Sequence, residues 1–382
     1  MGAGRSAETR RQWAIDRSRA IAKRADEISS GAPRASGTQL RAAVGRYFDD
    51  HPRLRERTLE IYKLHSEEFV AWADSAGIRK SDDLTRAHLV AFRAARAGLK
   101  KHVSDKGKGK KGAKTQTKTL RSPSTINIEL RAVRTILGYL RRLGLTTRLT
   151  SDDLTDGLKR VPVSHEAPEF LRPPDIRKLL QACAVHDAAT FAATREEHAG
   201  NGERGSTPRY DPIGPLVAVG LLSGMRYGEL VALDWSEVDL DEGEIRLTSR
   251  TKTKRARTVD LSVSPALGAI LWAQAPKAKR KGPVWSVTPD QIKAAAKRLG
   301  KHGAPASWNW QNLRRTCGTY LTNAPGIFGA ASAYRSARQL GHSVQVAERH
   351  YLGVVKVSKD AATLEAAMQV EAELAHWSKP AR

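Results

Sequence analysis

Apolar residues recur at helical spacing through most of the first part of the chain, from Thr38 to about Leu145. Residues that return every three or four positions fall on one face of a helix, and that face can be buried against other helices. The pattern predicts an all-helical domain over residues 37–147. The apolar positions include Leu59, Tyr62, Phe69, Trp72, Ile126, Leu130, Val133, Ile136, Leu137 and Leu140.

A lysine-rich segment, residues 100–119, interrupts this helical pattern. It holds eight lysines and one acid and offers no apolar face, so we expect a mobile cationic loop, either a solvated linker or an arm that grips phosphate. A phosphate-binding P-loop is excluded, because Ala113 follows Gly112 where that motif needs lysine. Ser124 is the expected N-cap of the next helix. The lysines are Lys100, Lys101, Lys106, Lys108, Lys110, Lys111, Lys114 and Lys118.

Beyond a proline-containing linker at 148–165, the pattern changes to a mixture of helices and strands. EIRLTS and ARTVDLS alternate apolar and polar residues around a basic turn, which predicts a β-hairpin. Helices are expected near 170–183, 289–299, 309–324 and 330–340. The sequence therefore predicts a multi-domain chain, with an all-α domain followed by a mixed α+β domain at 166–358 that is mainly helical and has a small antiparallel sheet.

The C-terminal segment, residues 359–382, is expected to form a helix or tail. Leu364, Met368 and Leu374 lie along a narrow apolar stripe within residues 360–377. This stripe predicts packing on the mixed domain or on a neighbouring subunit.

The charge of the chain points to a polyanionic partner. Lysine and arginine number 65 against 40 acids, for a net charge of +25 and a pI near 10.3. Phosphate contacts relieve this self-repulsion and release counterions, which makes nucleic acid the first candidate partner. Anionic membrane is the competitor, but the most apolar stretch, residues 212–225, is too short to span a bilayer. We expect no membrane partner.

The cysteines and the N-terminal residues favour a cytoplasmic protein. Cys183 and Cys317 are far apart and lack metal-binding spacing, which indicates neither a disulfide framework nor a zinc site. Residues 7–30 are rich in arginine but also carry acids, and they lack the apolar core of a targeting peptide. Residues 1–36 are therefore interpreted as a basic arm.

Four stretches in the second half place polar residues in restrictive contexts. They are SGMRYGELVAL (223–233), SRTKTKRARTVDL (249–261), WNWQNLRRTCGTYL (308–321) and LGHSVQVAERHYLG (340–353). Each alone has an ordinary interpretation: a surface ion pair, a solvated turn lysine, an exposed helix arginine, and a tyrosine packed on its neighbours. The candidate residues are Arg226, Glu229, Lys252, Gln311, Arg314, His342 and Tyr351.

Taken together and in this order, the stretches resemble the tyrosine recombinase (phage integrase) family. The family pattern runs G-x-R-x-x-E-L, a hairpin lysine, H-x-L-R-x-T, L-G-H, and a tyrosine nine residues after that histidine. This chain has GMRYGEL, KTKRARTVDL, QNLRRT, LGH and Tyr351 at that spacing. The resemblance covers residues 38–358, and chance agreement of all five elements is implausible.

The resemblance implies a site-specific DNA recombinase or integrase with a SAM-like core-binding domain that clamps double-stranded DNA and a separate catalytic domain. It implies a homo-tetramer on paired sites and a Holliday-junction intermediate. It also allows for an accessory DNA-bending or directionality factor. Neither a metal nor another cofactor is implied, and no ATP is needed, since a phosphotyrosine stores the energy of the broken strand. Such an enzyme would work in the cytoplasm of a bacterium, encoded by the host or by a phage.

The family chemistry assigns a role to each candidate residue. Arg226 and Arg314 would clamp the nonbridging phosphate oxygens, Tyr351 would be the nucleophile, and Glu229 would support the site. Lys252 would protonate the leaving oxygen, with Lys254 as the alternative, and His342 would share the proton transfer. Further DNA contacts are expected from the lysine-rich segment and from Lys254, Arg255, Arg257 and Arg315.

Gln311 departs from the family pattern, which usually has histidine at this position. An amide can donate a hydrogen bond to phosphate but cannot carry a proton. Two alternatives therefore stay open: a catalytically weak or inactive DNA-binding relative, and a topoisomerase-like or hairpin-resolving enzyme that uses the same tyrosine chemistry.

Overall fold

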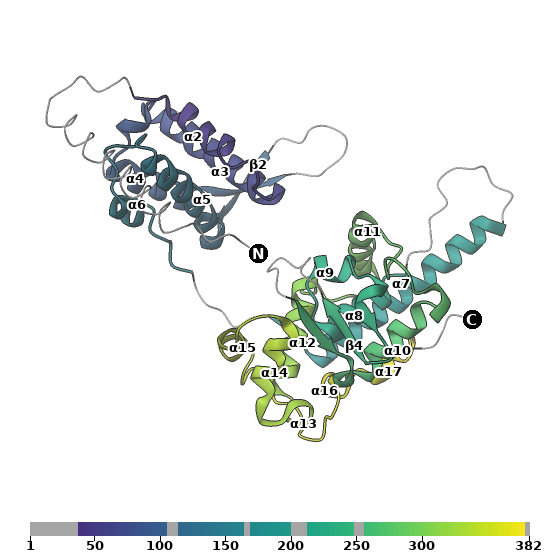
Figure 1. Ribbon diagram of the computed structural model, residues 1–382. Coiled ribbons are helices and arrows are strands. Elements are labelled where there is room, and N and C mark those ends of the chain that lie inside the picture. The colour runs from purple at the N-terminus through teal and green to yellow at the C-terminus, as the bar shows by residue number, and fades with distance from the viewer. Residues whose placement is uncertain (1–36, 105–113, 164–168, 200–211, 248–255, 379–382) are drawn as a thin grey trace. The chain divides into compact units, whose positions relative to one another are not determined.

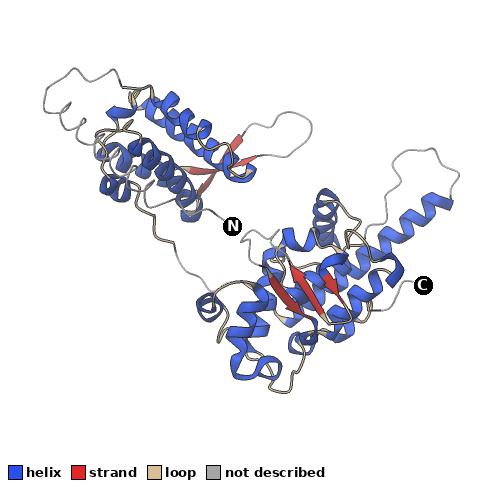
Figure 2. Ribbon diagram, in the orientation of Figure 1, coloured by secondary structure: helices blue, strands red, loops and turns tan. Residues whose placement is uncertain are grey.

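The computed structural model describes residues 37–104, 114–163, 169–199, 212–247 and 256–378, with only the backbone described for 100–104, 114–119 and 191–199. The chain divides into two compact units, residues 1–165 and 166–382. The described parts are mostly helical, and Figures 1 and 2 show the three-stranded antiparallel sheet of the second unit. This confirms the predicted fold class. No described helix is long and apolar enough to cross a membrane.

The first unit is a helical bundle with a buried aromatic and aliphatic core. Phe69 and Phe92 meet edge to face with their ring centroids 5.0 Å apart, and Leu130 and Leu137 pack into the same cluster. Most of the periodic apolar residues of the sequence thus lie in the core or against it, as helical spacing requires. The helices are α2 (Leu40–Asp49), α3 (Glu56–Ser75), α4 (Arg86–Ala97), α5 (Pro123–Arg142) and α6 (Ser151–Gly157), with a 3-10 turn at Ser81–Asp83.

Part of the lysine-rich segment is a two-stranded ribbon, where the sequence pattern predicted an irregular loop. Strands β1 (Lys100–Ser104) and β2 (Lys114–Leu120) pair antiparallel, with His102 opposite Gln116. The prediction failed because ladder hydrogen bonds between two polar strands need no apolar alternation. The lysines of residues 105–113 lie outside the described residues.

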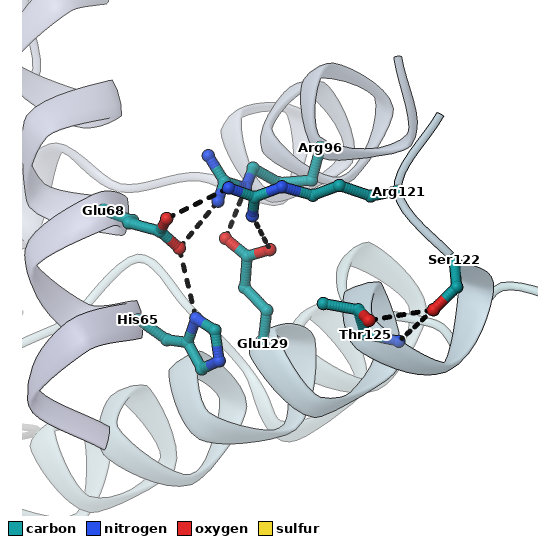
Figure 3. Close-up of polar contacts among 7 residues, drawn as sticks. All are labelled: His65, Glu68, Arg96, Arg121, Ser122, Thr125 and Glu129. Carbon is teal, nitrogen blue, oxygen red and sulfur yellow. Dashed lines mark hydrogen bonds and ion pairs between the residues drawn. The ribbon is translucent and has the colours of Figure 1, made fainter. Parts of the chain in front are cut away.

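Ser122, rather than the predicted Ser124, is the N-cap of helix α5. Its hydroxyl oxygen accepts a hydrogen bond from the backbone N–H of Thr125 at 3.2 Å (Figure 3). Pro123 takes the first helical position, where its missing N–H costs nothing and its fixed φ suits the helix. The helix therefore begins two residues earlier than predicted.

A buried network of charged residues ties the base of this ribbon to the bundle (Figure 3). Arg96 precedes β1 and its Nη2 donates to Glu68 at 2.7 Å, while Arg121 follows β2 and its Nη2 lies 3.3 Å from the same carboxylate. Both arginines also pair with the fully buried Glu129. For Glu68, burial is outweighed by a hydrogen bond from His65 and the charges of the two arginines, which bring its pKa to about 2.

This network was not foreseen in the sequence, and its composition invites comparison with a metal site. His65, Glu68 and Glu129 present ligand atoms within 4.8 Å of one another. The two guanidinium groups already neutralise both carboxylates, so a cation would have to displace buried ion pairs. The arrangement fits a structural anchor for the ribbon.

The second unit is built around α8 (Gly214–Ser223), whose ten residues are all buried. The apolar run at 212–225 is therefore a core helix, and it packs against α7 (Pro173–Ala199), α10 (Pro265–Gln274) and α12 (Trp310–Asn323). The sheet runs in the order β3 (Val238–Asp239), β4 (Glu244–Leu247), β5 (Arg257–Asp260), with Ile245 opposite Val259. The predicted hairpin strands are confirmed as β4 and β5.

Short helices complete the second unit (Figure 1). The helices expected near 289–299, 309–324 and 330–340 are confirmed as α11, α12 and α14. The elements not yet bounded are α9 (Tyr227–Val231), α11 (Pro289–Leu299), α13 (Pro325–Phe328), α14 (Ser332–Leu340), α15 (Val344–His350), α16 (Leu364–Met368) and α17 (Glu371–Leu374), and 3-10 turns at Trp235–Glu237, Leu261–Val263, Lys277–Lys279, Gly300–His302 and Gly329–Ala331.

The C-terminal segment is two short helices rather than the single helix that its apolar stripe predicted. Gln369 breaks it with a left-handed φ of 57°. Leu364, Met368 and Leu374 are fully buried in the core of the same unit. The stripe therefore packs within the chain, one of the two partners expected for it.

Candidate active site

Arg226 is positioned where helix α8 ends and α9 begins. Gly224 closes α8 with a left-handed φ of 60°, and a Cβ there would lie 2.4 Å from Leu340 Cδ2, so the close approach needs glycine. The backbone N–H of Arg226 donates to Glu229 Oε2 at 2.9 Å, and its Nη1 donates to Oε1 at 2.8 Å. Nη2 donates to the carbonyl of Gly341 at 3.2 Å. The guanidinium is thus fixed but, at 27% exposed, still reachable from solvent.

Arg314 lies beside it on helix α12 and is almost completely buried. Its Nη1 donates to the carbonyl of Gly224 at 2.7 Å and its Nη2 to that of Leu340 at 2.5 Å. Burial, and then repulsion from Arg257 and Arg226, lower its pKa to about 10. Arg314 therefore stays charged at neutral pH, and two permanent cations converge on the end of α14.

Arg257 does not lie on an open DNA-facing hairpin, as the sequence suggested. Its side chain is only 6% exposed, pairs with Glu229 and donates to the carbonyl of Gln339. The strand alternation of β5 turns it inward, where burial lowers its pKa and the charge of Glu229 raises it. The expectation of a direct DNA contact is therefore corrected to a buried support under the site.

His342 directly follows the end of α14, where Gly341 has a left-handed φ of 68°. Its Nδ1 lies 3.0 Å from the carbonyl of Ser343, which can only accept, so Nδ1 carries the proton. The Nε2 atom is buried and has no hydrogen-bond partner among the described residues. Burial lowers the His342 pKa, and the nearby arginines lower it further. A neutral imidazole therefore presents a free lone pair in this site.

Tyr351 stands next to His342, with ring centroids 5.6 Å apart. Its ring lies against Gly318 of α12, where a Cβ would be 3.2 Å from Tyr351 Cε2. Burial raises the pKa of this tyrosine, so it is protonated at neutral pH and needs a base to become a nucleophile. The rings of His342 and Tyr351 are thus neighbours with complementary protonation states.

Asn323 holds the backbone around Tyr351, and sequence reasoning missed it. Its Nδ2 donates to the carbonyl of Tyr351 at 2.6 Å, and its Oδ1 accepts from the N–H of Gly353 at 2.7 Å. No motif signalled this residue, because its contacts join positions about 30 residues apart.

The structure thus brings together Arg226, Glu229, Arg314, His342 and Tyr351. Gln311 is exposed on the first turn of α12. Arg315 is half-buried, with Nη1 3.4 Å from Asn312 Oδ1. Lys252, Lys254 and Arg255 lie outside the described residues, so their placement stays a prediction.

Comparison with known proteins matches most of the second unit to a known family. Residues 169–327 match the model of the phage integrase family. No curated protein sequence is significantly similar to the chain.

Solved structures share the fold at low sequence identity. A lambda integrase dimer bound to a core site matches with a TM-score of 0.53 and 14% identity, over 84% of this chain and 99% of that chain. The integrase of transposon Tn1549 in complex with a circular intermediate DNA matches with a TM-score of 0.51 and 14% identity, over 86% and 98%. Residues 169–327, which make up most of the second unit, therefore carry a domain of the phage integrase family.

Proposed function

We propose that the chain is a site-specific DNA recombinase that cuts and rejoins strands through a 3′-phosphotyrosine intermediate. The observation that carries this proposal is the convergence of Arg226 and Arg314 on the end of α14, beside the paired rings of His342 and Tyr351. Two guanidiniums supply the charge and fork geometry that stabilise a phosphoryl transition state, and a tyrosine next to a neutral imidazole supplies an activated nucleophile.

Double-stranded DNA is the proposed substrate. The net charge of +25 supports a polyanion, and the solved structures of similar fold include integrases bound to DNA. We assign DNA clamping to the first unit and catalysis to residues 166–358, with further phosphate contacts from the lysine-rich ribbon and Arg315. The linker expected at 148–165 is corrected, because helix α6 lies within it and packs into the core of the first unit. The enzyme would act in the cytoplasm, where bacterial and phage DNA lie.

The proposed reaction begins when the Tyr351 oxygen attacks the phosphorus of the scissile phosphodiester. His342 Nε2 accepts the phenolic proton, because its other nitrogen already donates to Ser343. A P–O bond forms to tyrosine and the P–O bond to the 5′ oxygen breaks, and Lys252 protonates that leaving oxygen. The reverse step, with a 5′-hydroxyl from the partner duplex, exchanges strands without ATP.

Recombination between paired sites would use a homo-tetramer and pass through a Holliday junction. DNA captured by protein carrying Tyr351→Phe can be sequenced to find the binding site, and two copies can then be placed in one plasmid. We expect inversion or excision between the sites. Relaxed plasmid without exchange would instead show a topoisomerase-like enzyme, and binding without any covalent adduct from wild-type protein would show an inactive relative.

Gln311 is expected to steady a phosphate oxygen rather than to move a proton. Gln311→His should keep or increase the cleavage rate, since imidazole donates the same hydrogen bond and also exchanges protons near neutral pH. Gln311→Ala should lose only one neutral donor, a penalty of ~3- to 10-fold in single-turnover cleavage. If Gln311→Ala cleaves as slowly as Arg314→Ala, the amide has a larger role than proposed here.

The lysines between β1 and β2 are expected to add affinity without sequence preference. Replacing Lys106, Lys108, Lys110 and Lys111 with glutamine leaves both strands in place and should weaken binding to all duplexes alike. It should also flatten the dependence of affinity on salt, because fewer counterions are released. Binding titrations at several salt concentrations on specific and random duplexes measure both effects. If the preferred DNA sequence changes while the dependence of affinity on salt stays the same, this segment contacts base edges rather than phosphates.

A further inference from the structure

Three successive backbone carbonyls at the C-terminal end of α14 each accept a hydrogen bond from a different arginine. The last carbonyls of a helix have no partner within the helix and carry the negative end of its dipole, so they attract cations. The pairs are Gln339 with Arg257, Leu340 with Arg314, and Gly341 with Arg226. The end of α14 therefore acts as a common anchor for three guanidinium groups.

Arg257 differs from the other two arginines, because its side chain is buried and its contacts are all with protein. Its Nη2 pairs with Glu229 Oε2, the same oxygen that accepts the backbone N–H of Arg226. The other oxygen, Oε1, holds Arg226 Nη1 at 2.8 Å. One carboxylate is thus shared between a buried arginine and the arginine proposed to meet phosphate.

The side-chain stem of Arg257 also sets the turn that leads to His342. A Cβ on Gly341 would lie 2.5 Å from Arg257 Cδ, so the backbone passes directly against this side chain. Gly341 has a left-handed φ of 68°, which together with the contact leaves room for glycine only. Arg257 therefore contacts two parts of the site: Glu229, which holds Arg226, and the turn that precedes His342.

We propose that Arg257 is a positioning residue for phosphoryl transfer: it holds Glu229 and the end of α14 so that the Arg226 guanidinium faces the scissile phosphate. This proposal rests on the proposed function above. Without Arg257, the full charge of Glu229 acts on Arg226 alone and draws its guanidinium toward the carboxylate. DNA affinity should not change, because only 6% of the Arg257 side chain is exposed and its partners are protein groups.

The test uses Arg257→Met, which keeps the stem and removes the charge, and Arg257→Lys, which keeps the charge with fewer donors. Arg246→Met is the matched control, because Arg246 lies on the adjacent strand β4, also forms ion pairs with carboxylates, and has a side chain that is 58% exposed. Each full-length variant is assayed for DNA affinity and for single-turnover cleavage of a suicide substrate. One substrate carries a normal scissile phosphate and the other a methylphosphonate, which has one fewer nonbridging charge.

We expect Arg257→Met to cleave the phosphate substrate slower by on the order of 10-fold at unchanged DNA affinity. The loss should be clearly smaller on methylphosphonate, where less charge develops for Arg226 to stabilise. Arg257→Lys should recover part of the rate. Adding Glu229→Gln to Arg257→Met should also recover part, because the unbalanced carboxylate is gone.

An equal loss on both substrates, or no loss, overturns the proposal. If Arg257→Met does not fold, as judged by its Tm, then Arg257→Lys carries the test with the same two substrates. Tyr351→Phe is assayed alongside. A covalent adduct formed by that variant would contradict the proposed function itself. If Tyr351→Phe forms no adduct but Arg257→Met cleaves at the wild-type rate, only this inference is wrong.

Discussion

Protein carrying Tyr351→Phe is expected to bind DNA with unchanged affinity and to form no covalent adduct on a suicide substrate. The phenolic oxygen is the only atom removed, and in the proposed reaction it makes the bond to phosphorus. The ring, its contact with Gly318 and the backbone hydrogen bonds to Asn323 all remain, so the fold should be unaffected. Denaturing gels with labelled DNA measure the adduct, and a filter or mobility assay measures the affinity.

Tyr334→Phe is the matched control for this experiment. Tyr334 lies on α14, the helix that ends just before His342, and its side chain is 54% exposed. The control variant should form adduct at the wild-type rate. A covalent adduct that survives in Tyr351→Phe would show that another residue attacks the phosphate, and the assignment of the nucleophile would then be wrong.

Helical periodicity predicted many of the helices, because a helix that buries one face needs apolar residues every three or four positions. The stretch 289–299 matches α11 (Pro289–Leu299), and alternation in EIRLTS matches β4. The ribbon β1–β2 could not be seen in the same way, because its polar strands are held by each other and by Arg96 and Arg121 rather than by an apolar face.

In the candidate site, too, the sequence indicated the motif residues but not the residues that tertiary packing places around them. Motif order and spacing identified the candidate residues, and the fold brings Arg226, Arg314 and Tyr351 close to one another. No local pattern indicated that Arg257 would turn inward, because its partners Glu229 and Gln339 are 28 and 82 residues away. Supporting residues of this kind are set by packing between elements, which periodicity along one element cannot report.

Arg314→Ala is expected to slow cleavage by on the order of 100-fold or more, as removal of a transition-state donor does. Arg226→Ala should have a comparable effect, since in the proposed reaction both guanidiniums stabilise the same phosphate. Arg314→Lys should recover little, because a single ammonium cannot reach the carbonyls of Gly224 and Leu340 and a phosphate oxygen at the same time. Single-turnover rates at saturating DNA separate this loss from any change in affinity.

Arg315→Ala is the control for Arg314→Ala, because it separates a loss of cleavage rate from a loss of DNA affinity. It lies on the same helix, is half-buried, and contacts Asn312 rather than the end of α14. Arg315→Ala should weaken DNA binding and slow cleavage at saturation far less than Arg314→Ala. The charge of Arg315 reaches Tyr351, but its guanidinium does not hold the end of α14. If Arg314→Ala instead loses DNA affinity but keeps its cleavage rate, then Arg314 only binds the DNA backbone. The charge that develops on the scissile phosphate would then be stabilised by Arg226 and by residues other than Arg314.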